Sequence, residues 1–147
     1  MADSACCLTE ISRKIYRSKV SSVLNRDTKQ FGKNNLCDNL EETCWNSDQG
    51  SPQWILLEFT EEIYMKELHL QFHGGFVGKT CWLESSQTDS TDLTKFHSFY
   101  PQDTNQTQVF KLLEMVPLKL LKIVFGDSTD SFGRITIYKL EIFGKAS

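Results

Sequence analysis

The stretch FGKNNLCDNLEETCWNSDQGSPQW, residues 31–54, carries the clearest information about the fold. It places Trp45 between two groups of turn-forming residues, Asp38-Asn39 and Asn46–Ser51. A large aromatic side chain framed by turns usually fills the core of a domain. Trp54 then opens an apolar run of the kind that forms a strand. We therefore predict that Trp45 and Trp54 both belong to the core.

The rest of the chain after this stretch is organised as short strands. Between Met65 and His73 the apolar residues Leu68, Leu70 and Phe72 alternate with polar ones, which is typical of a half-buried strand. Seven expected strands, with no long helix between them, predict an all-β antiparallel sandwich or barrel. They cover residues 54–59, 65–73, 80–85, 96–100, 108–112, 119–125 and 134–143. The Leu- and Lys-rich run 119–125 is also compatible with a helix.

The N-terminal segment has a different pattern. Residues 1–7 are expected to form a tail, and Leu8, Ile11 and Ile15 recur at helical spacing. A short amphipathic helix over 8–19 is expected, with an extended segment as the alternative. We divide the chain into a tail or short helix (1–17), one domain (18–144) and a short tail (145–147).

Length, charge and cysteine content exclude several classes of protein. The 147 residues fit one domain, and the net charge of −3 with dispersed Lys and Arg argues against direct binding of nucleic acid. No apolar run approaches the ~20 residues of a membrane span, and the N-terminus lacks the apolar region of a signal peptide. Five cysteines without framework spacing indicate free thiols in a reducing compartment. We interpret the chain as an intracellular monomer that does not contact membranes.

The sequence also lacks the motifs of catalytic and zinc sites. His69 and His73 would lie ~13 Å apart on a strand, too far to share one metal ion, so we expect two solvated histidines. The cysteines form no zinc-type pair, and there is no nucleophile elbow or phosphate-binding glycine loop. These absences favour a protein that is not an enzyme.

Several of these motifs resemble the galactose-binding-domain-like superfamily, which includes the discoidin (coagulation factor C-type) domains. Asp38, Thr43 and Trp45 match its early loop Asp-Gly-x-x-x-Thr-x-Trp, and the segment 53–55 matches the Gln-Trp and apolar residue that follow. The end of the chain, 134–144, resembles the closing strand. The resemblance covers about residues 18–144 and implies an antiparallel jelly-roll.

Two groups within the superfamily resemble this sequence more closely than the superfamily in general does. Residues 20–25, 31–54 and 130–134 resemble small jelly-roll proteins that bind an orphan nuclear receptor. This implies an adaptor in the nucleus, and also in the cytoplasm, that represses the receptor. The alternative is a DOC-like substrate-recruiting subunit of a ubiquitin ligase. That role calls for a docking tail, and only three residues follow Gly144, which disfavours it.

The resemblance also implies a structural calcium ion, the only cofactor that we expect. Its matching positions are Asp38, Thr43 and Glu141, with oxygen ligands of the type that calcium prefers. Asn39 replaces the family's glycine at this loop, so a simple hydrogen-bonded turn is the alternative.

Apolar side chains in glycine-flanked turns point to a protein partner. When they cluster at a surface, such side chains tend to mark interaction sites. Their alternative role is to cap the ends of the core. A carbohydrate-binding module is less favoured, because the two core tryptophans leave no obvious platform for a sugar. The predicted partner surface consists of Phe31, Asn46, Asp48, Phe76, Phe132 and Arg134.

Overall fold

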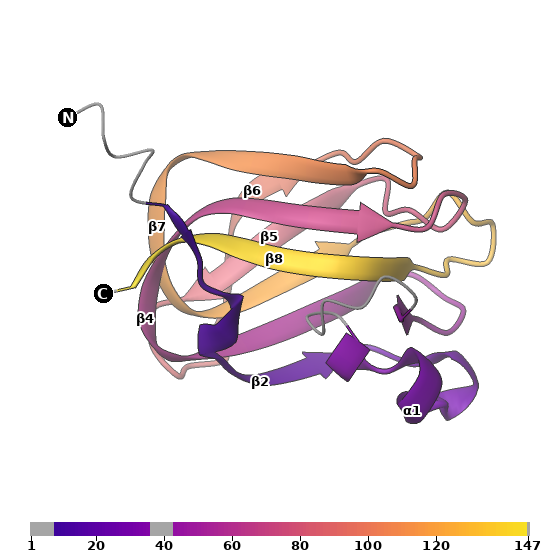
Figure 1. Ribbon diagram of the computed structural model, residues 1–147, viewed down its shortest axis with the longest axis horizontal. Coiled ribbons are helices and arrows are strands. Elements are labelled where there is room, and N and C mark those ends of the chain that lie inside the picture. The colour runs from indigo at the N-terminus through magenta and orange to yellow at the C-terminus, as the bar shows by residue number, and fades with distance from the viewer. Residues whose placement is uncertain (1–7, 36–42, 147) are drawn as a thin grey trace.

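The computed structural model describes residues 8–35 and 43–146, and it shows two layers of antiparallel strands that face each other (Figure 1). This confirms the all-β prediction. The one α-helix of the described part is α1 (Thr28–Phe31), and short 3₁₀ turns cover Ser12–Lys14, Leu24–Arg26 and Lys33–Asn35. The strands are β1 (Thr9–Glu10), β2 (Ile15–Val20), β3 (Trp45–Asn46), β4 (Gln53–Phe72), β5 (Cys81–Ser86), β6 (Thr94–Phe99), β7 (Thr107–Phe125) and β8 (Thr136–Ala146).

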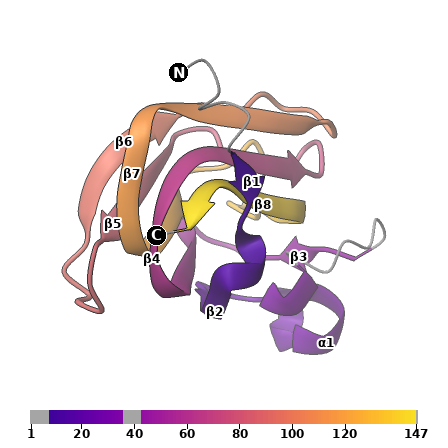
Figure 2. The same ribbon diagram turned by 60° about the vertical axis from the view of Figure 1, so that its left-hand side comes forward.

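Strands β4 and β7 belong to both layers. The first part of β4 pairs with β2 and with the second part of β7, whereas its later part pairs with β8 and with the first part of β7. The register shifts between Glu58 and Ile63, and both strands bend through the same end of the molecule (Figures 1 and 2). The expected strands 54–59 and 65–73 are therefore one strand, as are 108–112 and 119–125. The helical alternative for 119–125 is wrong, because alternate residues from Leu121 to Phe125 enter the core.

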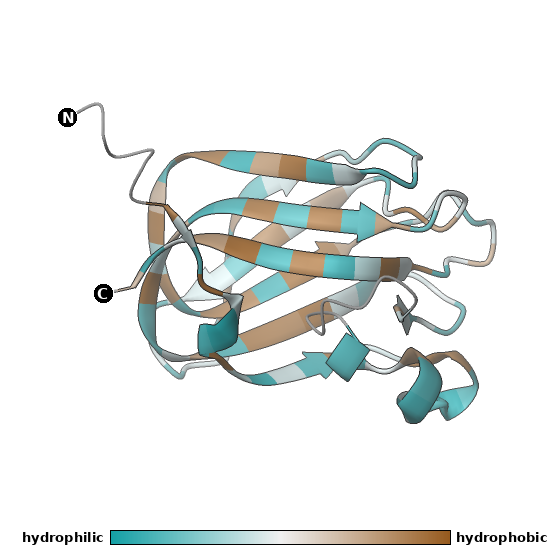
Figure 3. Cartoon of the chain, viewed as in Figure 1, coloured by the Kyte–Doolittle hydropathy of each residue, from teal (hydrophilic) through white to brown (hydrophobic). Residues whose placement is uncertain are grey.

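The core lies between the layers and is built from alternate residues of each strand, as the hydropathy colours show (Figure 3). Trp45 is fully buried, and its indole N–H donates to the carbonyl of Ser22 at 2.9 Å. Its ring lies 6.3 Å from that of Phe125, which Phe72 meets edge-on at 5.9 Å. The prediction for Trp45 is confirmed.

The prediction that Trp54 belongs to the core is wrong. Ile55 and Leu57 are the buried residues of this run, so Trp54 lies on the outer face of β4 by the alternation of a strand. Its ring is half-buried there, with the ammonium of Lys122 at 5.1 Å from the ring centre. The sequence of this run does not show the alternation of buried and outward residues, because Trp54, at an outward position, is itself apolar.

The N-terminal segment is extended, so the helix expected over 8–19 is wrong and its alternative is observed. β1 pairs with β8 through Thr9 and Gly144, and β2 pairs with β4. Ile11, between them, is buried in the core, which ties residues 9–17 to the sheet. Residues 1–7 lie outside the described residues. None of the helices described is long and apolar enough to cross a membrane.

We predict that two leucines of β7 differ sharply in their contribution to stability. Leu121 is fully buried and Leu113 is 97% exposed. Leu121→Ala should lower the free energy of unfolding by about 2–5 kcal/mol through lost burial and a cavity, and Leu113→Ala should change it by about 0.5 kcal/mol or less. Urea titrations measure both. Equal losses would contradict this packing.

Candidate functional site

A hollow of about 330 Å³ opens at the end of the molecule where β4 ends and β8 begins. We call it the loop hollow. Four separate segments form its wall: the 24–31 region, β3 and its preceding residue, the turn after β4, and the start of β8. The lining residues are Leu24, Phe31, Cys44, Asn46, His73, Phe76, Arg134, Thr136 and Tyr138.

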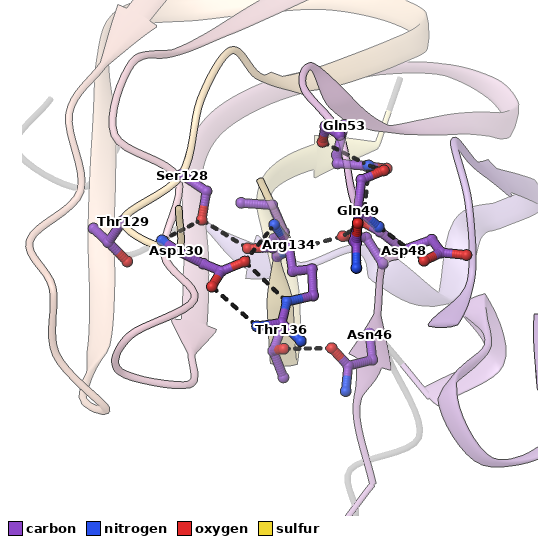
Figure 4. A network of polar contacts seen from close by, with 12 residues as sticks. Asn46, Asp48, Gln49, Gln53, Ser128, Thr129, Asp130, Arg134 and Thr136 are labelled. Atoms are coloured by element: carbon purple, nitrogen blue, oxygen red, sulfur yellow. Dashed lines mark hydrogen bonds and ion pairs between the residues drawn. The ribbon is translucent and has the colours of Figure 1, made fainter. Parts of the chain in front are cut away.

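Arg134 is the most firmly held polar side chain of the loop hollow. Its Nε and Nη2 donate to the two carboxylate oxygens of Asp130 at 2.9 and 3.1 Å, and its backbone N–H donates to the same carboxylate (Figure 4). The guanidinium also contacts two rings, with its centre 5.2 Å from the ring centre of Phe76 and 5.5 Å from that of Phe132. The hydrogen bonds from Arg134 lower the pKa of Asp130, and those to Asp130 raise the pKa of Arg134. The result is a planar cation fixed in orientation.

His73, Tyr138 and Cys44 form another part of the wall of the hollow. His73 Nδ1 lies 2.8 Å from the hydroxyl of Tyr138, and the His73 ring also contacts Phe76. Burial raises the pKa of Tyr138, with a smaller contribution from the charge of Cys44. Burial likewise raises the pKa of the Cys44 thiol. Because a reactive cysteine needs a lowered pKa, Cys44 is not an activated nucleophile.

A network of buried polar groups holds the 46–52 turn against the start of β8 (Figure 4). The hydroxyl of Ser47 accepts from the Ile135 N–H at 2.8 Å, and Thr136 donates to the Asn46 side chain at 2.6 Å. Gln53, which is buried, accepts from Ser21 and Ser22 and donates to the carbonyls of Asp48 and Gly50. These bonds fix the backbone on both sides of the loop hollow.

The structure brings four of the six predicted partner residues together: Phe31, Asn46, Phe76 and Arg134 all line the loop hollow. Phe132 is 59% exposed, and its ring centre lies 5.5 Å from the guanidinium of Arg134. Asp48 does not join them, because its carboxylate accepts from the Gln49 N–H at 2.9 Å and points away from Arg134 (Figure 4). The role of all six in binding stays a prediction.

Sequence reasoning missed His73, Tyr138 and Asp130 as parts of this site. The expectation of two solvated histidines is wrong, since His73 bonds Tyr138 and His69 bonds Glu67 at 2.9 Å while stacking on Phe143. The sequence did contain a signal for Asp130, because an acidic residue four positions before Arg134 in one turn can pair with it. None marked Tyr138, which reaches His73 only through the pairing of β8 with β4.

The calcium site stays a prediction. Asp38 lies outside the described residues, Thr43 precedes β3, and Glu141 stands opposite His69 in the pairing of β8 with β4. Within residues 8–35 and 43–146, no group of three or more His, Cys, Asp or Glu side chains is arranged to hold a metal ion. The described residues thus supply at most two of the three expected side chains.

Comparison with known proteins identifies relatives over nearly the whole chain. A family described as Sad1/UNC-like C-terminal matches residues 15–146. Nuclear receptor 2C2-associated protein of Danio rerio is 50% identical over 145 residues, which cover 99% of this chain and 98% of the relative. The protein of the same name in Homo sapiens is 49% identical over 128 residues, or 87% and 91% of the two chains. The chain belongs to the family of nuclear receptor 2C2-associated proteins. The chain also belongs to the Sad1/UNC-like family. The motifs of the sequence had not indicated this second relationship.

Solved structures with the same fold have little sequence in common with this family member. The F5/8 type C domain of a Bacteroides fragilis protein gives a TM-score of 0.81 at 10% identity, over 96% of this chain and 99% of that one. The family 32 carbohydrate-binding module of C. perfringens NanJ, solved with galactose, gives 0.77 at 12% identity, over 92% and 98%. These likenesses confirm the galactose-binding-like jelly-roll, and the family name with this fold fits a binding module.

We predict that the Asp130–Arg134 pair makes stability depend on pH. A carboxyl group whose pKa is lowered by folding stabilises the protein above its unfolded pKa, about 3.9, and that contribution is lost as pH falls through the lower folded pKa. At pH 7, Asp130→Asn should cost about 1–2 kcal/mol, and the gap to the wild type should narrow in acid. Urea unfolding at a series of pH values measures this, with Asp92→Asn, in an exposed loop, as the matched control. A gap that is constant with pH would contradict the pairing.

Proposed function

We propose that the chain is a non-enzymatic adaptor that binds an orphan nuclear receptor of the 2C2 type through the loop hollow and represses its transcriptional activity. The names of its relatives point to the receptor. The observation that carries the site is the guanidinium of Arg134 in contact with the rings of both Phe76 and Phe132, with Phe31 in the same hollow.

The loop hollow has the composition of a protein-binding centre. Aromatic residues and arginine dominate the binding energy of protein interfaces, particularly in pockets that exclude water. Arg134 is already fixed by Asp130 and by two rings, so little conformational entropy is lost when a partner covers it. A partner segment with an apolar side chain beside a carboxylate or carbonyl oxygen would complement this surface.

Repression would follow from occupation of the receptor surface. An adaptor bound there masks the groups that the receptor needs for dimerisation or for contact with DNA. The adaptor's own net charge of −3 suits a role that does not require it to touch DNA. This role places a monomeric chain in the nucleus, and also in the cytoplasm when it is not bound.

The chemistry of the loop hollow supports binding rather than catalysis. Cys44 and Tyr138 both have raised pKa values and stay neutral at physiological pH. His73 is bonded to the Tyr138 hydroxyl rather than to a thiol or a serine. The hollow thus offers shape, aromatic surface and one cation to a partner.

We predict that loss of the aromatic side chains weakens receptor binding without unfolding the domain. Phe132→Ala removes a ring that is mostly outside the core, and Phe31→Ala with Phe76→Ala removes the two phenylalanine rings of the hollow. Each variant should bind the purified receptor at least about tenfold more weakly by calorimetry, as expected when residues that carry the binding energy are truncated. In a reporter assay, each should also lose repression.

Leu113→Ala, near the middle of β7, is the control and should bind as the wild type does. Thermal melts separate lost binding from lost folding. If Phe132→Ala binds normally, the hollow is not the receptor site. If the wild type captures ubiquitin-ligase subunits, or binds galactose saturably without the receptor, the adaptor function is wrong.

A further inference from the structure

A second concave surface lies outside the loop hollow, between α1 with its following turn and the outer face of the β2–β4 layer. It has a volume of about 620 Å³. Its floor is apolar and its rim is basic. The residues that define it are Val20, Val23 and Trp54 on the floor, and Lys19, Lys29 and Lys33 on the rim.

The floor exists because Trp54 faces outward from β4. Val124 is its partner on β7, and Trp82 is the partner of Val124 on β5. Val124 is almost fully buried although it belongs to the outer face. Lys122 lies over the Trp54 ring at 5.1 Å and holds this side chain in place. The groove therefore has a preformed aromatic floor.

The rim gathers positive charge from three elements of an acidic chain. Lys19 comes from β2, Lys29 from α1, and Lys33 from the turn after it, and all three are exposed. Lys33 is oriented by its bond to the carbonyl of Ser18 at 2.5 Å. None of the three forms an ion pair with another residue of 8–35 or 43–146, whereas Arg17 and Lys14 do. With a net charge of −3 for the whole chain, this corner is locally basic.

The groove continues along the sheet. Lys19 also lines an adjoining hollow of about 420 Å³, which extends over Leu56 and Glu58 of β4. The outward residues from Trp54 to Glu58 span ~13 Å of strand, enough for about four residues of an extended peptide. At this far end, the carboxylate of Glu58 is paired with Arg17 at 3.1 Å, and that of Asp89 with Lys119 at 2.7 Å. We call the two hollows together the trough.

We infer that the trough binds a linear acidic peptide of a partner protein. An apolar side chain of the peptide packs on Trp54, and its carboxylates meet Lys19, Lys29 and Lys33. The charge pattern favours a peptide over a nucleic acid, because a regular polyphosphate would run over the carboxylates of Glu58 and Asp89. This surface is separate from the loop hollow, so its test does not depend on receptor binding there.

The test uses a short synthetic peptide in which acidic residues flank one phenylalanine, titrated into the isotope-labelled full chain and followed by NMR. The indole N–H of Trp54, assigned with Trp54→Phe, and the amides of Lys19 and Lys29 should shift in a saturable way. The double variant Lys29→Glu, Lys33→Glu should weaken binding about tenfold. Lys79→Glu with Lys111→Glu, two exposed lysines outside the trough, gives the same change of net charge and should leave the affinity intact.

Lys19→Glu with Lys29→Glu is a second variant that leaves the Lys33 bond to Ser18 untouched and should weaken binding similarly. A peptide with alanine for phenylalanine, or glutamine for the acidic residues, should bind several-fold more weakly. The inference fails if both double variants bind like the wild type or if the shifts map to the loop hollow. It also fails if a single-stranded oligonucleotide shifts the same resonances more strongly than the peptide.

Discussion

The antiparallel pair formed by β4 and β7 holds the architecture together, because its hydrogen bonds run through both layers. Two separate sheets would be free to slide over each other, whereas these layers share two continuous strands and are fixed in relative position. The bend at one end sets the separation of the layers, which Trp45, Phe72 and Phe125 then fill. The loops at the other end are therefore held at the separation that the two layers have. The geometry of the loop hollow thus depends on the backbone pairing of β4 with β7, including the part that lies away from the hollow.

The all-β class and most strand positions were predictable from the sequence, because alternation such as that of residues 65–73 follows from burial on one face. The continuity of β4 was not, since Glu61 and Glu62 at the bend read as an interruption of the apolar pattern. The orientation of Trp54 was misjudged for the opposite reason, because its run reads as uniformly apolar. Phe31 and Phe76, both part of the predicted partner surface, do line one hollow. The contact of His73 with Tyr138 was not predictable, as it requires the register between β4 and β8.

The short α1 segment lies between the two surfaces and contributes to both. Phe31 lines the loop hollow, while Lys29 of the same helical turn lines the trough. Asp27 caps the turn by accepting from the Gln30 N–H at 3.1 Å, and Lys33 fastens the following residues to β2. A rotation of this turn would alter both surfaces together. The cap and the Lys33 bond therefore hold the two surfaces in place together, one of them aromatic with a paired arginine and the other rimmed by exposed lysines.

The pairing of Thr9 with Gly144 has a mechanical consequence. It brings the first and last strands side by side at the end of the molecule remote from the loop hollow, as Figure 1 shows for β1 and β8. Tension applied between these two strands would load this two-residue ladder together with the bonds that join Ile11 and Ser12 to Ile142, at 2.8 and 2.9 Å. A tether attached at either of these strands would thus leave the recognition loops, at the opposite end of the molecule, facing outward.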